Sequence, residues 1–145
     1  MARVPPMQNQ TAILAIAGRV LIAALFLLSG LGKIAAPAVT QGYIASAGLP
    51  APLLGYLIAI IIEVGGGLLL VIGYQARGVA LILAAFALAT ALVFHHDFVD
   101  QNQMIHFLKN IAIAGGLLQV AAFGAGSLSL DARRLQRRAL MQSGR

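Results

Sequence analysis

The sequence predicts an all-α membrane protein, a polytopic four-helix bundle with its N- and C-termini in the cytoplasm. Of its 145 residues, 60% are hydrophobic and 10% are charged, whereas soluble domains carry about 25% charged residues. The mean hydropathy is +0.90. The apolar residues form four runs, each close to the roughly 20 residues that a helix needs to cross the hydrocarbon core. This composition excludes an ordinary soluble domain and a disordered chain.

The spans follow from the apolar runs in chain order. Polar residues 1–11 form an N-terminal tail, and a basic tail covers residues 125–145. Between the first two spans, residues 39–47 predict a short helix at the membrane interface, with Thr40 as its cap. Gly73 is suited to end the second span, because glycine readily adopts the left-handed conformation after a helix. The transmembrane domain, residues 12–124, therefore contains spans at about 12–31, 53–72, 77–94 and 105–123.

The distribution of Lys and Arg predicts the orientation, because basic residues are retained on the cytoplasmic side of a membrane. With the N-terminus inside, the outer side holds only Lys33 and Lys109 of the ten basic residues. The inner side holds the other eight, which are Arg3, Arg19, Arg77, Arg133, Arg134, Arg137, Arg138 and Arg145. The cluster at 133–138 is interpreted as a tail that lies against anionic lipid. Nucleic acid is not expected as a partner, since the chain has no Trp and few aromatic residues for stacking.

A secretory signal peptide is the alternative for the first span, because residues 36–38 have the small side chains of a cleavage site. The apolar run is longer than the roughly 7–15 residues of a signal peptide. Arg19 also interrupts it. We therefore expect the first span to remain in the protein as a membrane helix.

Three charged residues lie within the apolar spans, namely Arg19, Glu63 and Lys109. Charged groups in a bilayer usually face a protein interior or water, and each of these lies on a stripe of small residues that favours close helix packing. Counting about 1.5 Å per residue from the cytoplasmic ends places Arg19 about 9 Å deep and Glu63 about 15 Å deep. Arg19 and Glu63 are therefore the predicted ion pair, while Lys109 extends outward or reaches Asp97, Asp100 or Glu63.

The predicted pair has two interpretations. A buried ion pair can fix the register of the helices without binding any substrate. It can also line a pocket near the membrane midplane that binds a polar headgroup or relays a proton. The candidate residues of this polar interior are Arg19, Lys33, Glu63, Lys109 and Asn110.

No metal site is predicted. His95, His96 and His106 are weak candidates, because imidazole is a common ligand but their spacing matches no metal-binding motif. A solvated polar loop is the preferred interpretation. The chain has no cysteine, so a redox role would depend on a bound cofactor or on the chemistry of a partner.

Four segments resemble the DoxX family, and they contain most of these polar residues. The segments are residues 19–33, 42–50, 63–73 and 102–110, and the likeness as a whole covers about residues 13–124. The resemblance implies a small four-helix protein of the bacterial cytoplasmic membrane. Founding relatives are described as subunits of a thiosulfate:quinone oxidoreductase, and others are linked to membrane redox and oxidative-stress complexes. The absence of cysteine argues against a direct sulfur-transfer role.

The resemblance and the charged stripes lead to one main hypothesis. The protein is a subunit or accessory protein of a quinone-linked redox or oxidative-stress complex, with quinone as the candidate cofactor and Phe26 or Phe107 packing against its ring. Its expected partners are the lipid bilayer, a membrane or peripheral redox protein and a second copy of the chain. The alternatives are a small proton-coupled transporter that uses Glu63, and a non-catalytic assembly factor of the membrane. Whether the protein is itself an enzyme stays open.

Overall fold

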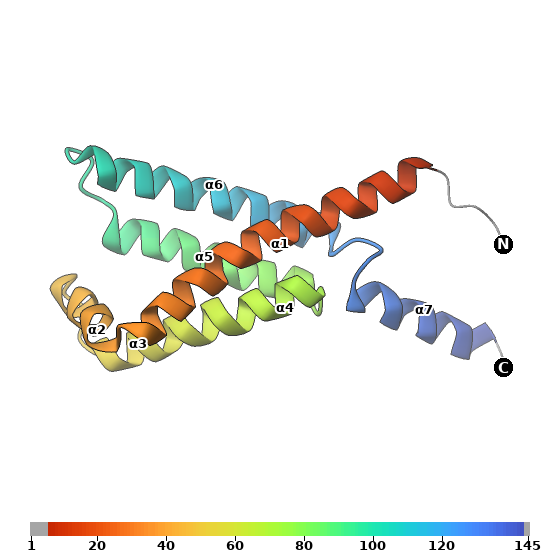
Figure 1. Ribbon diagram of the computed structural model, residues 1–145, viewed down its shortest axis with the longest axis horizontal. Coiled ribbons are helices and arrows are strands. Elements are labelled where there is room, and N and C mark those ends of the chain that lie inside the picture. Colours follow the sequence, from red (N-terminus) through yellow and green to blue (C-terminus); the bar gives the residue numbers. More distant parts are fainter. Residues whose placement is uncertain (1–5, 144–145) are drawn as a thin grey trace.

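The protein is a bundle of membrane-spanning helices with a short helix beside it and an amphipathic helix at its C-terminal end (Figure 1). The computed structural model describes residues 6–143, with side chains from residue 9 onward. The elements in order are α1 (Pro6–Ala35), α2 (Pro37–Ser46), α3 (Pro52–Ile60), the π-helical turn η1 (Ile61–Gly65), α4 (Gly66–Ile72), α5 (Ala76–Phe94), α6 (Gln101–Phe123) and α7 (Leu130–Ser143).

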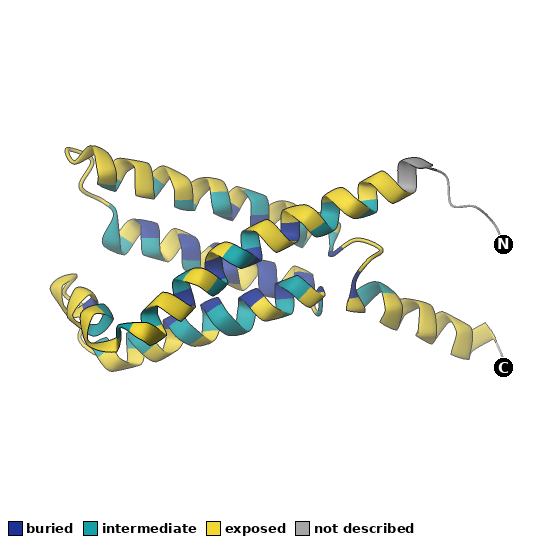
Figure 2. Ribbon diagram, viewed as in Figure 1, coloured by how far each residue is buried: buried dark blue, intermediate teal, exposed yellow. Residues whose placement is uncertain are grey.

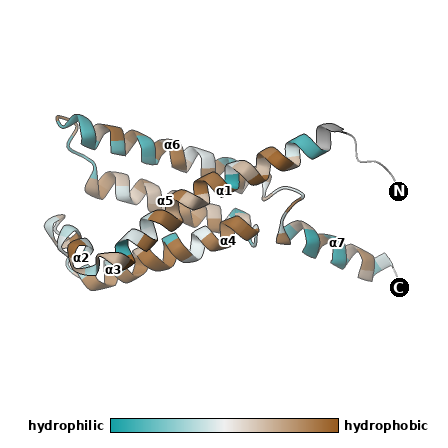
Figure 3. Ribbon diagram, in the orientation of Figure 1, coloured by the Kyte–Doolittle hydropathy of each residue, from teal (hydrophilic) through white to brown (hydrophobic). Residues whose placement is uncertain are grey.

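Four helical segments are long and apolar enough to cross a membrane: Asn9–Ala35, Pro52–Ile72, Ala76–Phe94 and Gln101–Phe123. The predicted all-α architecture with four spans is therefore confirmed. Hydrophobic residues dominate these helices, whereas hydrophilic residues are frequent in α7 and in the loop between α5 and α6 (Figure 3).

Helix α1 is longer than the span predicted at 12–31. It begins at Pro6 and ends at Ala35, so the polar residues 6–11, expected to belong to a tail, extend the helix. Proline is compatible with this start, because the first turn of a helix has no use for the missing N–H. Residues 1–5 and 144–145, with Arg3 and Arg145, lie outside the described residues.

Helix α2 confirms the short helix predicted between the first two spans, but its start differs. Ala36 is the N-cap and Pro37 opens the helix. Thr40 is not the cap, because its hydroxyl donates a hydrogen bond to the carbonyl of Ala36 at 2.9 Å. The ring of Tyr43 stacks on that of Phe94 with 5.2 Å between centroids, which ties α2 to the end of α5.

The core lies where α1, α4, α5 and α6 meet, and the buried residues face one another across this region (Figure 2). Helices α5 and α6 pack against each other most extensively, and α1 packs against η1 and α4. Helix α5 contributes a face of small residues, all of them buried: Ala80, Ala84, Ala87 and Ala91. Small side chains allow helices in a bilayer to approach closely, where hydrophobicity alone gives no preference for contact between helices.

Both ends of the described chain lie at one end of the bundle, the end from which α7 projects (Figure 1). Gly73 ends α4 there with φ at +67°, as predicted. The excess of Lys and Arg at this end leads us to expect it in the cytoplasm. The chain has no native cysteine, so labelling a single cysteine introduced at Val99 or at Gln142 from either side of the membrane checks this orientation.

Candidate functional site

Glu63 lies inside η1, the π-helical turn that joins α3 to α4 in the second span. Its side chain is only 6% exposed. Single π turns within α-helices are frequent at functional sites. The sequence analysis did not predict this turn. The signal nearest to it is the run of three glycines at 65–67, because glycine lowers the helix propensity of a segment.

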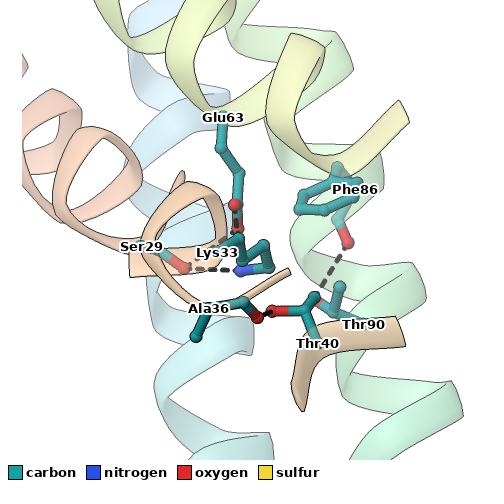
Figure 4. A network of polar contacts seen from close by, with 7 residues as sticks. All are labelled: Ser29, Lys33, Ala36, Thr40, Glu63, Phe86 and Thr90. Atoms are coloured by element: carbon teal, nitrogen blue, oxygen red, sulfur yellow. Dashed lines mark hydrogen bonds and ion pairs between the residues drawn. The ribbon is translucent and has the colours of Figure 1, made fainter. Parts of the chain in front are cut away.

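Glu63 forms an ion pair with Lys33 rather than with Arg19 (Figure 4). Lys33 Nζ lies 2.9 Å from Glu63 Oε2 and donates a hydrogen bond to Oε1 at 3.0 Å. Ser29 completes the cluster, since its hydroxyl donates to Oε1 at 3.0 Å and accepts from Lys33 Nζ at 2.8 Å. Oε2 is buried and accepts no hydrogen bond of good geometry among the described residues, so the ammonium group of Lys33 at 2.9 Å compensates its charge.

The predicted Arg19–Glu63 pair is therefore wrong. Arg19 is buried as expected, with 2% of its surface exposed, but its guanidinium group donates hydrogen bonds to backbone carbonyls. Its partners are Val71 at 3.2 Å, Leu128 at 3.1 Å and Ala125. Val71 lies in the last turn of α4, where the free carbonyls and the helix dipole favour a cation. Arg19 thus joins α1 to the end of α4 and to the loop before α7.

The error came from the register between α1 and the second span. A Cβ on Gly73 would lie 3.1 Å from Cζ of Arg19, so Arg19 is level with the end of α4 and not about 9 Å inside the bundle. A Cβ on Gly30 would lie 3.2 Å from Cβ of Glu63, so Glu63 is level with Gly30. Lys33 lies three residues beyond Gly30 on the same face of α1. Its side chain therefore reaches the carboxylate of Glu63.

The close approach at Gly30 gives the first testable prediction. A Cβ there would lie 2.6 Å from Cγ2 of Val64 and 3.4 Å from its backbone nitrogen, so Gly30→Ala must push α1 away from η1. We expect a loss of about 1–3 kcal/mol in the free energy of unfolding, measured by titration with denaturing detergent. Gly32→Ala is the matched control on the same helix, because a Cβ there meets nothing within 4 Å. Equal effects of the two changes would contradict the described contact.

The ion pair borders a cavity of about 640 Å³. Its walls are predominantly apolar and include Phe26, Tyr43 and Phe94. Lys33 and Glu63 reach the cavity from α1 and η1. Ligand pockets of roughly this volume, with apolar walls and a few polar groups, bind small molecules in proteins. The arrangement can therefore hold a ligand that has an apolar body and a polar atom directed at the ion pair.

The other predicted site residues lie toward α6. Lys109 is exposed rather than turned into the bundle axis, although it borders the cavity with the half-buried Asn110. His95 and His106 also border it, and their rings stack with 5.0 Å between centroids. His96 is exposed. Between residues 6 and 143, no three His, Cys, Asp or Glu side chains come together as a metal site would require.

Two aromatic residues were expected to pack against a bound ring, and the structure separates them. Phe26 is buried and borders the cavity, whereas Phe107 packs edge-on against Phe98 with 5.0 Å between centroids. The prediction missed Ser29, Thr40 and Thr90, which add hydroxyl groups to the cavity wall. Hydroxyl residues in an apolar span give a weak signal, because they often bond to the backbone of their own helix, as Thr90 does to Phe86 at 3.0 Å.

The polar cluster lies in the part of the chain that matches a known family. Residues 14–96 match the family DoxX. The chain belongs to the DoxX family. The matched segment contains Ser29, Lys33 and Glu63, whereas Lys109 and Asn110 lie beyond it. The resemblance inferred from the sequence is therefore confirmed at the level of the family.

Two relatives in Escherichia coli (strain K12) support the family and the location of this member. The chain is 40% identical to inner membrane protein YqjF over 113 residues, which cover 78% of the chain and 85% of YqjF. It is 36% identical to inner membrane protein YphA over 127 residues, which cover 83% of the chain and 90% of YphA. No solved structure gives a significant match. With its four spans, the protein is a multi-pass protein of the bacterial inner membrane.

Proposed function

We propose that this DoxX-family protein is a membrane subunit or accessory protein of a quinone-linked redox complex, and that its cavity binds the quinone headgroup. The observation that carries the proposal is one buried ion pair at the edge of a predominantly apolar cavity of about 640 Å³. An isoprenoid quinone matches this chemistry, since its ring is flat and apolar on both faces and its polarity is confined to the ring oxygens. The apolar tail would continue into the surrounding lipid.

The residues of the ion pair fit a ring oxygen in either redox state. Lys33 uses two of its three N–H donors on Ser29 Oγ and Glu63 Oε1. The third donor can bind a carbonyl oxygen. Glu63 Oε2 is buried and accepts no hydrogen bond within the described chain, and a rotation of the carboxylate toward the cavity would let it accept one from a ring hydroxyl. A bound quinone would supply the electron-accepting chemistry, and Lys33 and Glu63 would orient it and hold a proton at the carboxylate.

The electron donor must be a bound cofactor or a partner protein. The sequence has no cysteine, so iron–sulfur or dithiol chemistry cannot be supplied by its own side chains. This requirement supports a membrane or peripheral redox partner, and it makes the protein the part of the complex that binds quinone in the bilayer. A homo-oligomer remains a further expected partner.

The test is to purify the protein in a mild detergent, extract bound quinone with solvent and quantify it by mass spectrometry. We expect the wild-type protein to carry quinone and Glu63→Gln to carry much less. Ala89→Phe, which places a ring at the edge of the cavity, should also lower the content. Ala85→Phe is its matched control, because both alanines are exposed on α5 but only Ala89 borders the cavity.

Two outcomes would contradict the proposal. One is a wild-type protein that carries no quinone and shows no saturable binding of an added short-chain quinone. The other is equal quinone content in wild type, Glu63→Gln and Ala89→Phe. The second result would show that quinone dissolves in the detergent micelle instead of binding beside Glu63.

A proton-coupled transporter is the second candidate. It is favoured by the burial of one carboxylate, that of Glu63, within the second span. Intramembrane carboxylates commonly relay protons in transporters. Under this proposal, a pH gradient across proteoliposomes would drive substrate movement, and Glu63→Gln would abolish it. A protein that only assembles other components would instead keep its cellular role when Lys33 and Glu63 are both replaced by apolar residues.

A further inference from the structure

A second cavity, of about 650 Å³, lies between the start of α5, the end of α6 and the first turns of α7. It is distant from the Lys33–Glu63 cluster in the fold, at the end of the bundle where the described chain begins and ends (Figure 1). Three arginines border it: Arg77 from α5, and Arg134 and Arg138 from α7. The proposed quinone site leaves these three residues without a role.

The position of α7 beside this cavity is held by specific contacts. Asp131 caps the start of α5, since its carboxylate oxygens accept from the backbone N–H of Gln75 at 2.8 Å and of Ala76 at 2.9 Å. Its own N–H donates to the carbonyl of Gly73 at 3.0 Å. The guanidinium carbon of Arg134 lies 4.5 Å from the ring centre of Tyr74. Arg134 and Arg138 are therefore held beside the same cavity as Arg77 by a helix with defined contacts, and not by a loose tail.

The cavity has a surplus of positive charge. Asp131 is the acidic residue that borders it, against three arginines, and both of its oxygens are already engaged by backbone N–H groups. The Lys33–Glu63 pair is the sole ion pair within residues 9–143, so Arg77, Arg134 and Arg138 have no carboxylate partner there. Guanidinium groups bind phosphate oxygens well because their N–H donors match the phosphate geometry.

The depth of the cavity indicates where such a phosphate comes from. The span α6 ends at Phe123 and the span α5 begins at Ala76, so the cavity lies at the edge of the hydrocarbon region. Lipid phosphates lie at this level. Phe123 and Leu135 border the cavity and are 78% and 67% exposed, which gives apolar surface for the lipid chains beside the charged groups.

We propose that this cavity binds the headgroup of an anionic phospholipid, with the lipid phosphate held among Arg77, Arg134 and Arg138. General attraction of a basic tail to a membrane would involve all four arginines in residues 133–138. The proposed site instead uses Arg134 and Arg138 from this group, together with Arg77 from α5. Basic pockets at the ends of membrane helices recognise anionic headgroups in this way. The site is independent of what the cavity beside the Lys33–Glu63 pair binds.

The test is native mass spectrometry of the full chain in detergent, titrated with phosphatidylglycerol and, separately, with phosphatidylcholine. We expect saturable binding of phosphatidylglycerol only. Replacing Arg134 and Arg138 together by glutamine should weaken this binding by about thirtyfold. The matched control replaces Arg133 and Arg137 together by glutamine, which removes the same charge from the same helix outside the cavity and should change the affinity by less than about twofold.

Arg77→Gln provides a second variant, because Arg134 also contacts Tyr74 and its loss could disturb α7. This variant should weaken phosphatidylglycerol binding as well, with the thermal midpoint of the protein unchanged. Equal losses from the two double variants would overturn the proposal in favour of diffuse attraction. Full displacement of the lipid by inorganic phosphate, or equal binding of phosphatidylcholine, would overturn the assignment of an anionic lipid as the source of the phosphate.

Discussion

Arg19→Met is expected to lower the free energy of unfolding by at least about 3 kcal/mol, because hydrogen bonds from a charged group contribute about 1.5–3 kcal/mol each. The methionine keeps the apolar stem of the side chain but cannot donate to the carbonyls of Val71, Leu128 and Ala125. These acceptors would lose a charged donor at the point where three parts of the chain meet. Unfolding in mixed micelles of mild and denaturing detergent measures the loss.

Lys109→Met serves as the control for this prediction. It also removes a cation from a membrane-spanning helix, but Lys109 is exposed and forms no ion pair or hydrogen bond with the described residues. Its effect on stability should stay within about 0.5 kcal/mol, as for most exposed positions. If the two variants unfold alike, the stabilising role assigned to the guanidinium group of Arg19 is wrong.

Lys33→Met is expected to have the second large effect, a destabilisation of about 3 kcal/mol. Removing one partner of a buried ion pair leaves the other charge without compensation, which costs about 3–5 kcal/mol. We take the lower end of this range because the Lys33 side chain is 26% exposed. The same detergent titration measures the change, and quinone content is measured on the same sample.

The double variant Lys33→Met with Glu63→Leu separates packing from function. Apolar residues often replace a buried ion pair with little loss of stability, so we expect the double variant to recover most of the stability lost in Lys33→Met. Quinone content should not recover, because neither polar partner of the ring oxygen remains. A double variant that recovers both properties would show that the ion pair only fixes the packing of α1 against η1.

Local patterns in the sequence were sufficient to predict the four spans, the end of α4 and the burial of two charged residues. The apolar runs located four helices, Gly73 ended α4, and the burial of Arg19 and Glu63 followed from the unfavourable energy of a charge in lipid. These features depend on residues close together in the chain. They did not require knowledge of how one helix is placed against another.

The partners of the charged residues could not be obtained in this way. Ion pairing between helices depends on their relative register, and each turn of error moves a residue by about 5.4 Å along the axis. Glu63 is level with Gly30, eleven residues from Arg19, so roughly 16 Å separate the two levels and the prediction was wrong by about two turns. That error paired Arg19 with Glu63 and left Lys33 on the outer side. Lys109 was misplaced for a related reason, because small residues on one face of α6 do not specify which neighbouring helix covers that face.

The wide turn at η1 also changes which residues of the second span share one face of the helix. In a regular helix, steps of four residues overshoot the 3.6-residue turn, so a set spaced in fours winds gradually around the surface. A π turn takes up more residues for each rotation and cancels part of this winding. Ala59, Glu63 and Gly67 consequently all remain buried. Deleting one residue from 61–65 would restore an ordinary helix and leave the two halves of the span nearly in phase, so the change would act mainly on the direction of the carboxylate.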